Sequence, residues 1–151
     1  MTTVKIEGLS ELKDALEELS KATARNVQKR ALIEAAGPLE ADAERLAPFR
    51  KGTLKRSITI SPKLSSRQRS LHKPTAKVEM FVGPGSLVQA ITSEFGTSHS
   101  APRPFMRPAW DKNKKPMLLS IRDFLAEQIE KARQRAARKA ARILAKMQGA
   151  N

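Results

Sequence analysis

The chain has 151 residues, with 29 Lys and Arg, 15 Asp and Glu, and no Cys. This length fits one domain with a tail, and the lack of cysteine excludes disulfides and Cys-based metal sites. No apolar run approaches the roughly 18 residues of a membrane helix, and the polar segment 1–8 is too short for a signal peptide, so we expect no membrane partner. Phe and Trp are few, so the core must be mainly aliphatic, and we expect subunit contacts to supplement it.

The positive charge is unevenly distributed along the chain. The formal net charge is +14. Residues 1–49 carry seven Lys/Arg and nine Asp/Glu, whereas residues 50–100 carry nine and two, and residues 101–151 carry thirteen and four. Basic surfaces bind nucleic acid, acidic proteins or anionic lipid. The last two thirds of the chain therefore indicate an anionic partner from one of these classes.

The first third predicts a strand followed by a long helix. Residues 2–7, TTVKIE, are short and β-branched, which favours a strand. From Leu9, apolar residues recur at three- and four-residue spacing, which predicts an amphipathic helix in one or two pieces to about residue 46, with Ser10 as its N-cap. The Gly-Pro pair at 37–38 predicts a kink or a break, because proline removes a helical hydrogen bond.

The middle third predicts an antiparallel hairpin that carries a basic loop. Residues 54–60 have moderate strand character, and residues 76–83 alternate apolar and polar side chains, the clearest strand pattern in the chain. Between them, residues 62–75 are polar and basic without periodicity, so we expect a mobile loop. Residues 87–94 fit a short helix or a turn.

The last third predicts a second long helix. We expect it to begin near Pro108, because proline suits a first helical turn, and to restart at Pro116. Apolar residues from Leu118 to Met147 form one helical stripe. The expected fold is α+β: a long N-terminal helix packs on a small, mostly antiparallel sheet, and a long basic helix closes the chain. A second, basic stripe on this helix comprises Lys131, Arg135, Arg138, Lys139, Arg142 and Lys146.

Residues suited to catalysis are scarce. The sequence contains no Gly-x-Ser-x-Gly nucleophile, no phosphate-binding glycine loop and no clustered metal ligands, so we expect no enzymatic activity, cofactor or metal. The acidic residues of the first helix have the spacing of a solvated face. The strongest enzymatic alternative is a nuclease that pairs the two histidines, His72 and His99.

Two interpretations of the basic stripe remain open. Residues 131–146 hold seven positive charges and no negative ones, although like charges four residues apart repel by a few tenths of a kcal/mol per pair. The stripe is either a free solvated tail or the contact for a polyanion or an acidic protein. If it neutralises about five phosphates, a plot of log DNA affinity against log salt should have a slope of roughly −4.5.

Residues 93–110 place aromatic side chains in a loop stiffened by proline. We expect Gly96 to allow a sharp turn, and Pro102 and Pro104 to keep the following segment extended. The loop could serve catalysis, connect a strand region to the last helix, or grip another chain.

The side chains of this loop favour the connecting role. Phe95 and Phe105 are expected in the core, and Glu94 is expected to form a local ion pair with Arg103 or Arg107 rather than to act as an acid catalyst. The residues expected to seat the last helix are Phe105, Met106 and Trp110.

The same loop contains two motifs, Glu94-Phe95-Gly96-Thr97 and Pro104-Phe105-Met106-Arg107-Pro108-Ala109. At this separation they resemble the signature of a tailed-phage neck or tail-completion family, typified by the gene-ten product of Hong Kong 97-like siphophages and similar to the minor tail protein Z of lambda-like phages. The resemblance covers about residues 4–125. Further agreement lies in Gly8-Leu9 with Leu12 and Leu16, and in Ala47-Pro48 followed by Gly52, Leu54, Arg56, Ser57 and Ile58.

The resemblance implies a structural virion protein without catalysis. Such proteins form an oligomeric ring at the head–tail junction, between the head connector and the tail tube and terminator proteins, with DNA in the channel; before that they assemble in the host cytoplasm. It predicts a neck-like domain over residues 1–125 and a continuous basic helical extension over residues 126–151. Charge alone leaves the alternative of a DNA- or RNA-binding protein that uses residues 131–146. Subunit or partner contacts are expected at Glu94, Phe95, Gly96, Thr97, Arg103, Pro104, Phe105, Arg107 and Pro108.

Overall fold

The computed structural model describes residues 9–148, and the strand predicted at residues 2–7 lies outside them. The chain order of the elements is α1 (Leu9–Glu17), α2 (Lys21–Leu46), α3 (Thr53–Ser57), β1 (Thr59–Ser61), α4 (Ser66–Leu71), β2 (Phe81–Gly83), α5 (Val88–Phe95) and α6 (Met106–Gln148).

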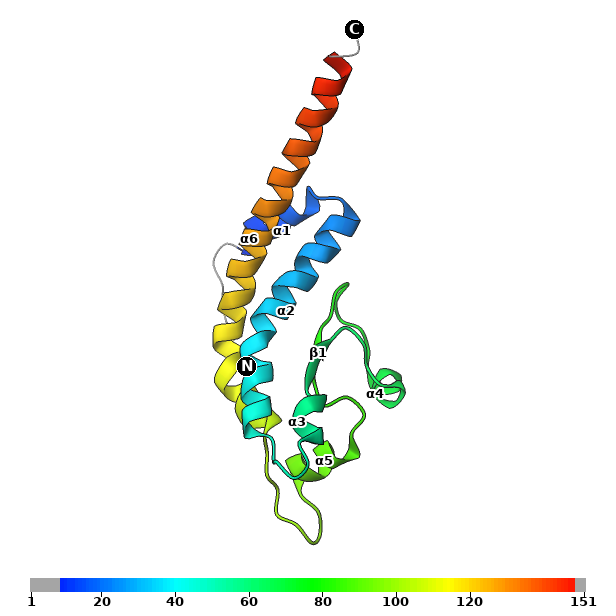
Figure 1. The fold of residues 1–151 in the computed structure, drawn as a ribbon, viewed down its shortest axis with the longest axis vertical. Coiled ribbons are helices and arrows are strands. Elements are labelled where there is room, and N and C mark those ends of the chain that lie inside the picture. Colours follow the sequence, from blue (N-terminus) through cyan, green and yellow to red (C-terminus); the bar gives the residue numbers. More distant parts are fainter. Residues whose placement is uncertain (1–8, 149–151) are drawn as a thin grey trace.

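The two longest helices, α2 and α6, form the frame of the molecule. They lie side by side and run in opposite directions, as the colour order in Figure 1 shows. Small side chains at a contact let two helices pack at short interaxial distance. The residues that α2 buries are mostly of this kind: Val27, Ala31, Ala35, Ala36, Leu39 and Ala43.

A small antiparallel sheet packs against α2. Strands β1 and β2 pair with Ile60 opposite Val82, and both strands contact α2. The Glu40 carboxylate on α2 accepts a hydrogen bond from the backbone N–H of Ile60 at 3.0 Å, which ties the sheet to the helix. The predicted α+β fold is therefore confirmed, with a long helix on a small antiparallel sheet and a long C-terminal helix.

Two hydrophobic clusters hold these elements together. The larger one joins α2, α3, α5 and α6, and its largest fully buried side chains are Phe105 and Ile58. The second one joins α1 to α2 and α6 through Leu16, Val27 and Ile129. The last buried residue of α6 is Ala132, and all residues at 133–148 are exposed. Figure 1 shows this end of α6 projecting beyond the rest of the described chain.

We predicted a kink or a break at residues 37–38, and the structure shows no break: α2 runs through Pro38 from Lys21 to Leu46. A proline inside a helix costs about 3 kcal/mol. Pro38 itself is exposed, whereas its neighbours Ala36 and Leu39 are buried in the contacts that hold the helix. Packing of the buried face thus overrides the local signal. Likewise, α6 begins at Met106 and continues through Pro116 without the predicted restart, although Pro108 does lie in its first turn as expected.

The first helical segment is divided elsewhere, between Glu17 and Lys21. Ser20 is the N-cap of α2, and its hydroxyl accepts a hydrogen bond from the backbone N–H of Thr23 at 3.3 Å. Ser10, which we predicted as an N-cap, lies inside α1. The helical segment therefore comes in two pieces, one of the two alternatives that the sequence left open, and the N-cap was assigned to the wrong serine.

The strand predicted at residues 54–60 is mostly wrong. Gly52 has a φ of +71° and precedes the short helix α3, and only Thr59–Ser61 form a strand. Leu54 and Ile58 are both buried in the larger cluster. Leu54 lies in α3 and Ile58 is the residue that ends it, and the helical turn brings both side chains to the same core.

The remaining hairpin is shorter and more ordered than predicted. Strand β2 covers Phe81–Gly83 instead of residues 76–83, since Glu79 accepts hydrogen bonds from the backbone N–H groups of Thr75 and Ala76 and so closes a turn there. The predicted mobile loop at 62–75 contains helix α4. The helix or turn predicted at 87–94 is confirmed as α5.

Candidate subunit interface

Glu94, in the last turn of α5, caps the beginning of α6. Its carboxylate accepts hydrogen bonds from the backbone N–H groups of Phe105, Met106 and Arg107 at 2.8, 3.0 and 3.1 Å. The first N–H groups of a helix have no partner within the helix. A buried carboxylate from the preceding helix, only 6% exposed, supplies their acceptors and also favours the positive end of the helix dipole.

Arg107 closes the same contact from the other side. Its Nε donates to the Glu94 carboxylate at 3.0 Å, and its Nη2 donates to the Glu94 carbonyl oxygen at 2.9 Å. Burial opposes ionisation of Glu94, but the three backbone donors and Arg107 outweigh it and hold the pKa of this carboxyl below its usual value. The predicted ion pair is thus confirmed with Arg107, and it is buried on the Glu94 side rather than exposed.

The chain turns sharply between α5 and α6. Gly96 has a φ of +77°, and a Cβ there would lie 2.8 Å from the carbonyl oxygen of Ser100. Thr97 and Ser100 form an isolated antiparallel bridge that closes the turn. The backbone N–H of Arg103 donates to the Ser93 carbonyl at 2.7 Å, whereas the Arg103 side chain makes no ion pair with Glu94. Only glycine fits the Gly96 position, as its motif predicted.

The two phenylalanines of the motifs have opposite environments. Phe105 is fully buried, as expected, but Phe95 is 65% exposed, so its predicted core position is wrong. Trp110, expected to seat the last helix, is 48% exposed. Phe95 follows the buried Glu94 directly, and neighbouring positions on a helix point about 100° apart. The capping role of Glu94 therefore turns Phe95 outward.

Phe95 belongs to an exposed apolar face of α5. Val88 and Ile91, seven and four residues earlier, are also more than half exposed, and this spacing places all three on one side of the helix. The Arg107 guanidinium lies 4.9 Å from the centroid of the Phe95 ring, a cation–π distance that fixes the ring. We call Val88, Ile91 and Phe95 the α5 face. Sequence reasoning missed its first two members, although their helical spacing with Phe95 was available as a signal.

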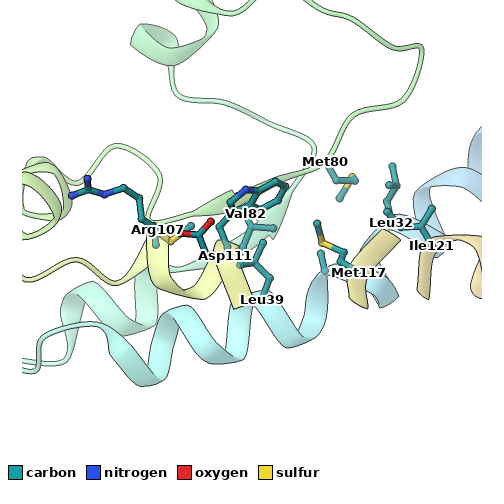
Figure 2. A pocket seen from close by; sticks show the side chains of 11 residues that line it. Leu32, Leu39, Met80, Val82, Arg107, Asp111, Met117 and Ile121 are labelled. Atoms are coloured by element: carbon teal, nitrogen blue, oxygen red, sulfur yellow. The ribbon is translucent and has the colours of Figure 1, made fainter. Parts of the chain in front are cut away.

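A second uncovered apolar surface is a groove between α2, the hairpin and α6, with a volume of about 590 Å³ (Figure 2). Leu32 and Leu39 come from α2, Met80 and Val82 from the hairpin, and Met117 and Ile121 from α6. Figure 2 shows Arg107 extending away from these side chains, toward the α5 side. Methionine-rich grooves adapt their shape to apolar partners.

The end of α6 carries the predicted basic stripe. All six of its residues are exposed, and Lys131 forms an ion pair with Glu127. The same segment exposes Ile143, Leu144 and Met147 by at least half, which with the alanines at 136 and 140 make an apolar side. Arg133 pairs at 2.8 Å with Glu18, the residue directly after α1, where α6 leaves the body of the molecule. The projecting helix is therefore amphipathic as well as basic.

The catalytic alternative gains no support from the placement of the histidines. His72 Nε2 lies 2.7 Å from Glu79 Oε2 and its ring packs edge-on against Phe81, whereas His99 lies exposed in the turn after α5. Among residues 9–148, no group of three or more His, Asp or Glu side chains could hold a metal ion. None of the helices described is both long and apolar enough to cross a membrane.

Comparison with known protein families shows which family the chain resembles. Residues 10–96, from α1 to the turn after α5, match the model of the family described as "Bacteriophage HK97-gp10, putative tail-component". The chain belongs to this family. No curated protein and no solved structure matches the chain significantly. The resemblance seen in the sequence is thereby confirmed.

The family match ends at Gly96, so the second motif, residues 104–109, lies outside it. The structure nevertheless joins both motifs, because the carboxylate of the first one binds the backbone of the second one. Membership in a tail-component family identifies a phage virion protein that interacts with other structural proteins, and it favours a structural role over catalysis.

Proposed function

We propose that this tail component forms an oligomeric ring at the head–tail junction, where it completes the neck between the head connector and the tail tube and terminator proteins, with DNA in the channel. The observation that carries the proposal is the α5 face. It presents three large apolar side chains to solvent on a helix that Glu94 holds rigidly. Exposed apolar patches on a soluble subunit mark interaction sites.

Within this proposal, the predicted interface residues divide into two roles. Glu94, Gly96 and Phe105 shape the turn between α5 and α6, since Glu94 and Phe105 are buried and only glycine fits at position 96. The residues that remain exposed for contact with a neighbouring subunit are Phe95, Thr97, Arg103, Pro104, Arg107 and Pro108.

The groove and the projecting end of α6 offer surfaces for further partners. In the proposed ring, the apolar side of residues 133–148 contacts an adjoining virion protein, and its cations pair with acidic groups around that contact. The division into a neck-like domain at 1–125 and an extension at 126–151 belongs to the same proposal. Ile129 and Ala132 still pack in the cluster with α1, which anchors the extension to the body.

The runner-up function is a DNA- or RNA-binding protein that uses residues 131–146. The favouring observation is that the cations of residues 133–148 are exposed and no acidic residue lies among them. Strong DNA binding by an isolated monomer, lost when residues 134–151 are removed, would favour it over the ring.

Electron microscopy and native mass spectrometry of purified protein test the ring. We expect rings of defined size for the natural chain, alone or after addition of connector or tail-tube protein. The double variant Ile91→Ser with Phe95→Ser should remain folded and monomeric. Leu71→Ser is the matched control, because Leu71 is 80% exposed on α4, outside the α5 face. A monomer that binds neither partner, or rings that persist in the double variant, would contradict the proposal.

A further inference from the structure

A second cationic surface lies on the segment that connects the two strands. We call residues 62–80 the hairpin arm. It carries five Lys and Arg and one acidic residue, and no acidic residue occurs between Arg50 and Val78. The last part of the arm, including Lys77 and Met80, lies beside α2 and α6, whereas Figure 1 shows α4 on the outer side of the arm, away from these helices. The arm is thus a separate cationic surface, at a different place from the end of α6.

The arm is ordered by polar contacts rather than by a core. Helix α4 has no buried residue, but Ser65 and Gln68 form a complete capping box at its beginning. The Gln68 side chain also donates to the Gly85 carbonyl at 3.3 Å, which ties α4 to the end of the hairpin. Arg69 donates to the Leu64 carbonyl at 3.2 Å. These bonds hold an element that buries almost nothing, so the arm presents its charges in a fixed arrangement.

The acidic residue of the arm, Glu79, makes its hydrogen bonds and its ion pair within the arm. Glu79 accepts hydrogen bonds from Thr75 and Ala76 and pairs with His72 at 2.7 Å. Its charge therefore organises the turn and does not neutralise the lysines and arginines. Within residues 9–148, no carboxylate lies within ion-pair distance of any of the five cations, which are Lys63, Arg67, Arg69, Lys73 and Lys77.

A further group of cations comes shortly before the arm in the sequence. Arg50, Lys51, Lys55 and Arg56 precede β1, and none of them pairs with a carboxylate in the described chain. The side chains of Ser65, Gln68 and Ser70 already donate hydrogen bonds within the chain, and the exposed Ser66 adds a hydroxyl beside Arg67. Hydroxyl groups next to Lys and Arg are donors that proteins use on nucleic-acid phosphates.

The two cationic surfaces differ in chemistry. The end of α6 combines its charges with an exposed apolar side, which suits a protein partner. The arm combines its charges with polar side chains, and its one strongly exposed apolar residue is Leu71. Insertion into a lipid surface requires an apolar face, which the arm does not offer.

We infer that the hairpin arm binds the phosphate backbone of duplex DNA, without reading its sequence. Under the proposed function, that DNA is the duplex that passes through the channel of the ring. The inference rests on the proposed function only for this source of the DNA. The binding surface differs from the one that charge counting favoured, which was the α6 stripe. Backbone contact of this kind holds DNA loosely and lets it slide.

The test measures binding of a fluorescent 30-base-pair duplex by anisotropy at several salt concentrations. The arm variant is Lys63→Glu, Arg67→Glu and Lys73→Glu, whose side chains are all exposed. The control is Lys139→Glu, Arg142→Glu and Lys146→Glu at the end of α6. Both variants exchange two lysines and one arginine, so they change net charge equally. Circular dichroism confirms that each is folded.

For the natural chain, we expect a slope of log affinity against log salt of about −4.5, from roughly five phosphate contacts. The arm variant should reduce the slope to about −2 and weaken binding at least tenfold at low salt, whereas the control should keep the natural slope. An equal or larger loss in the control, an unchanged arm variant, or no DNA binding at low salt would overturn the inference. Arm-dependent binding to vesicles with anionic lipid in place of DNA would also overturn it.

Ring formation is measured on the same samples. We expect rings in the arm variant, because the α5 face is unchanged. Arm-dependent DNA binding by a chain that forms no rings would refute the ring and leave the arm contact in place. Rings whose DNA binding does not depend on the arm would refute the arm contact and leave the ring in place.

Discussion

Arg107 binds Glu94 at two points, through its Nε to the carboxylate at 3.0 Å and through its Nη2 to the main-chain carbonyl at 2.9 Å. The second bond engages an orphan carbonyl in the last turn of α5, while the carboxylate engages the first N–H groups of α6. One residue pair therefore joins the end of one helix to the beginning of the next. This junction sets the direction of α6 and the exposure of the α5 face.

Replacement of Glu94 should destabilise the fold. In Glu94→Ala, the backbone N–H groups of Phe105, Met106 and Arg107 lose their acceptor, which we expect to lower the free energy of unfolding by about 2–3 kcal/mol. Glu94→Gln should lose less, because its amide oxygen still accepts. Urea denaturation measures the change. Glu17→Ala, an exposed carboxylate on α1, should change it by less than about 0.5 kcal/mol. Equal effects at both sites would refute the capping role.

The two phenylalanines should separate stability from assembly. Phe105→Ala removes a fully buried ring and should cost about 3–5 kcal/mol of unfolding free energy. Phe95→Ala should leave the denaturation midpoint nearly unchanged and weaken oligomers, because its ring is mostly exposed. Thermal unfolding and sizing by light scattering give the two readouts. A large loss of stability in Phe95→Ala would instead place that ring in the core.

Glycine substitutions test the turn after α5. Gly96→Ala would bring a Cβ to 2.8 Å from the Ser100 carbonyl oxygen and 2.9 Å from Pro102 N, both backbone atoms that cannot give way easily. Together with the positive φ, this should lower stability by more than about 1 kcal/mol. The control is Gly37→Ala inside α2, where nothing lies within 4 Å of the added carbon. That change should raise stability by roughly 0.4–1 kcal/mol, so the two should shift the melting temperature in opposite directions.

Acid should weaken the hairpin arm. Hydrogen bonds from Thr75, followed by His72, lower the pKa of Glu79 to about 2, against about 4.3 for an unfolded glutamate. Because the folded pKa is depressed, the stabilisation is complete above the unfolded pKa and is lost as the pH falls from about 4.3 toward 2. In Glu79→Gln, the loss of stability across that window should be smaller than in the natural chain. Denaturation at pH 6, 4 and 3 measures the difference, and parallel curves would exclude a contribution from Glu79.

Removal of the projecting helix should leave the fold intact. A chain that ends at Arg133 retains every buried residue of α6, so its unfolding free energy should change by less than about 0.5 kcal/mol. Assembly with partner proteins, measured by co-sedimentation, should decline because the apolar side of the helix is gone. A cooperative loss of stability would show that these residues belong to the folded body.

The sequence by itself determined the parts of this protein that depend on local spacing. Helical periodicity located the two long helices, alternation located the second strand of the hairpin with bounds that were too wide, and the two motifs identified the family. Gly96 was interpreted correctly because a tight turn with positive φ is a property of the backbone itself. The ion pair between Glu94 and Arg107 also followed from proximity in the chain.

Tertiary structure decided the rest, because packing and distant hydrogen bonds overrode local preferences. Pro38 stays helical since α2 is held by its buried face against α6. Leu54 lies in helix α3 and Ile58 directly follows it, because one core takes up both side chains. Residues 66–71 form helix α4, whose N-cap is Ser65. Whether Phe95 faced the core or solvent could not be read from composition. The exposure of Phe95 follows from the inward position of Glu94, which binds the N–H groups of residues more than ten positions away in the chain.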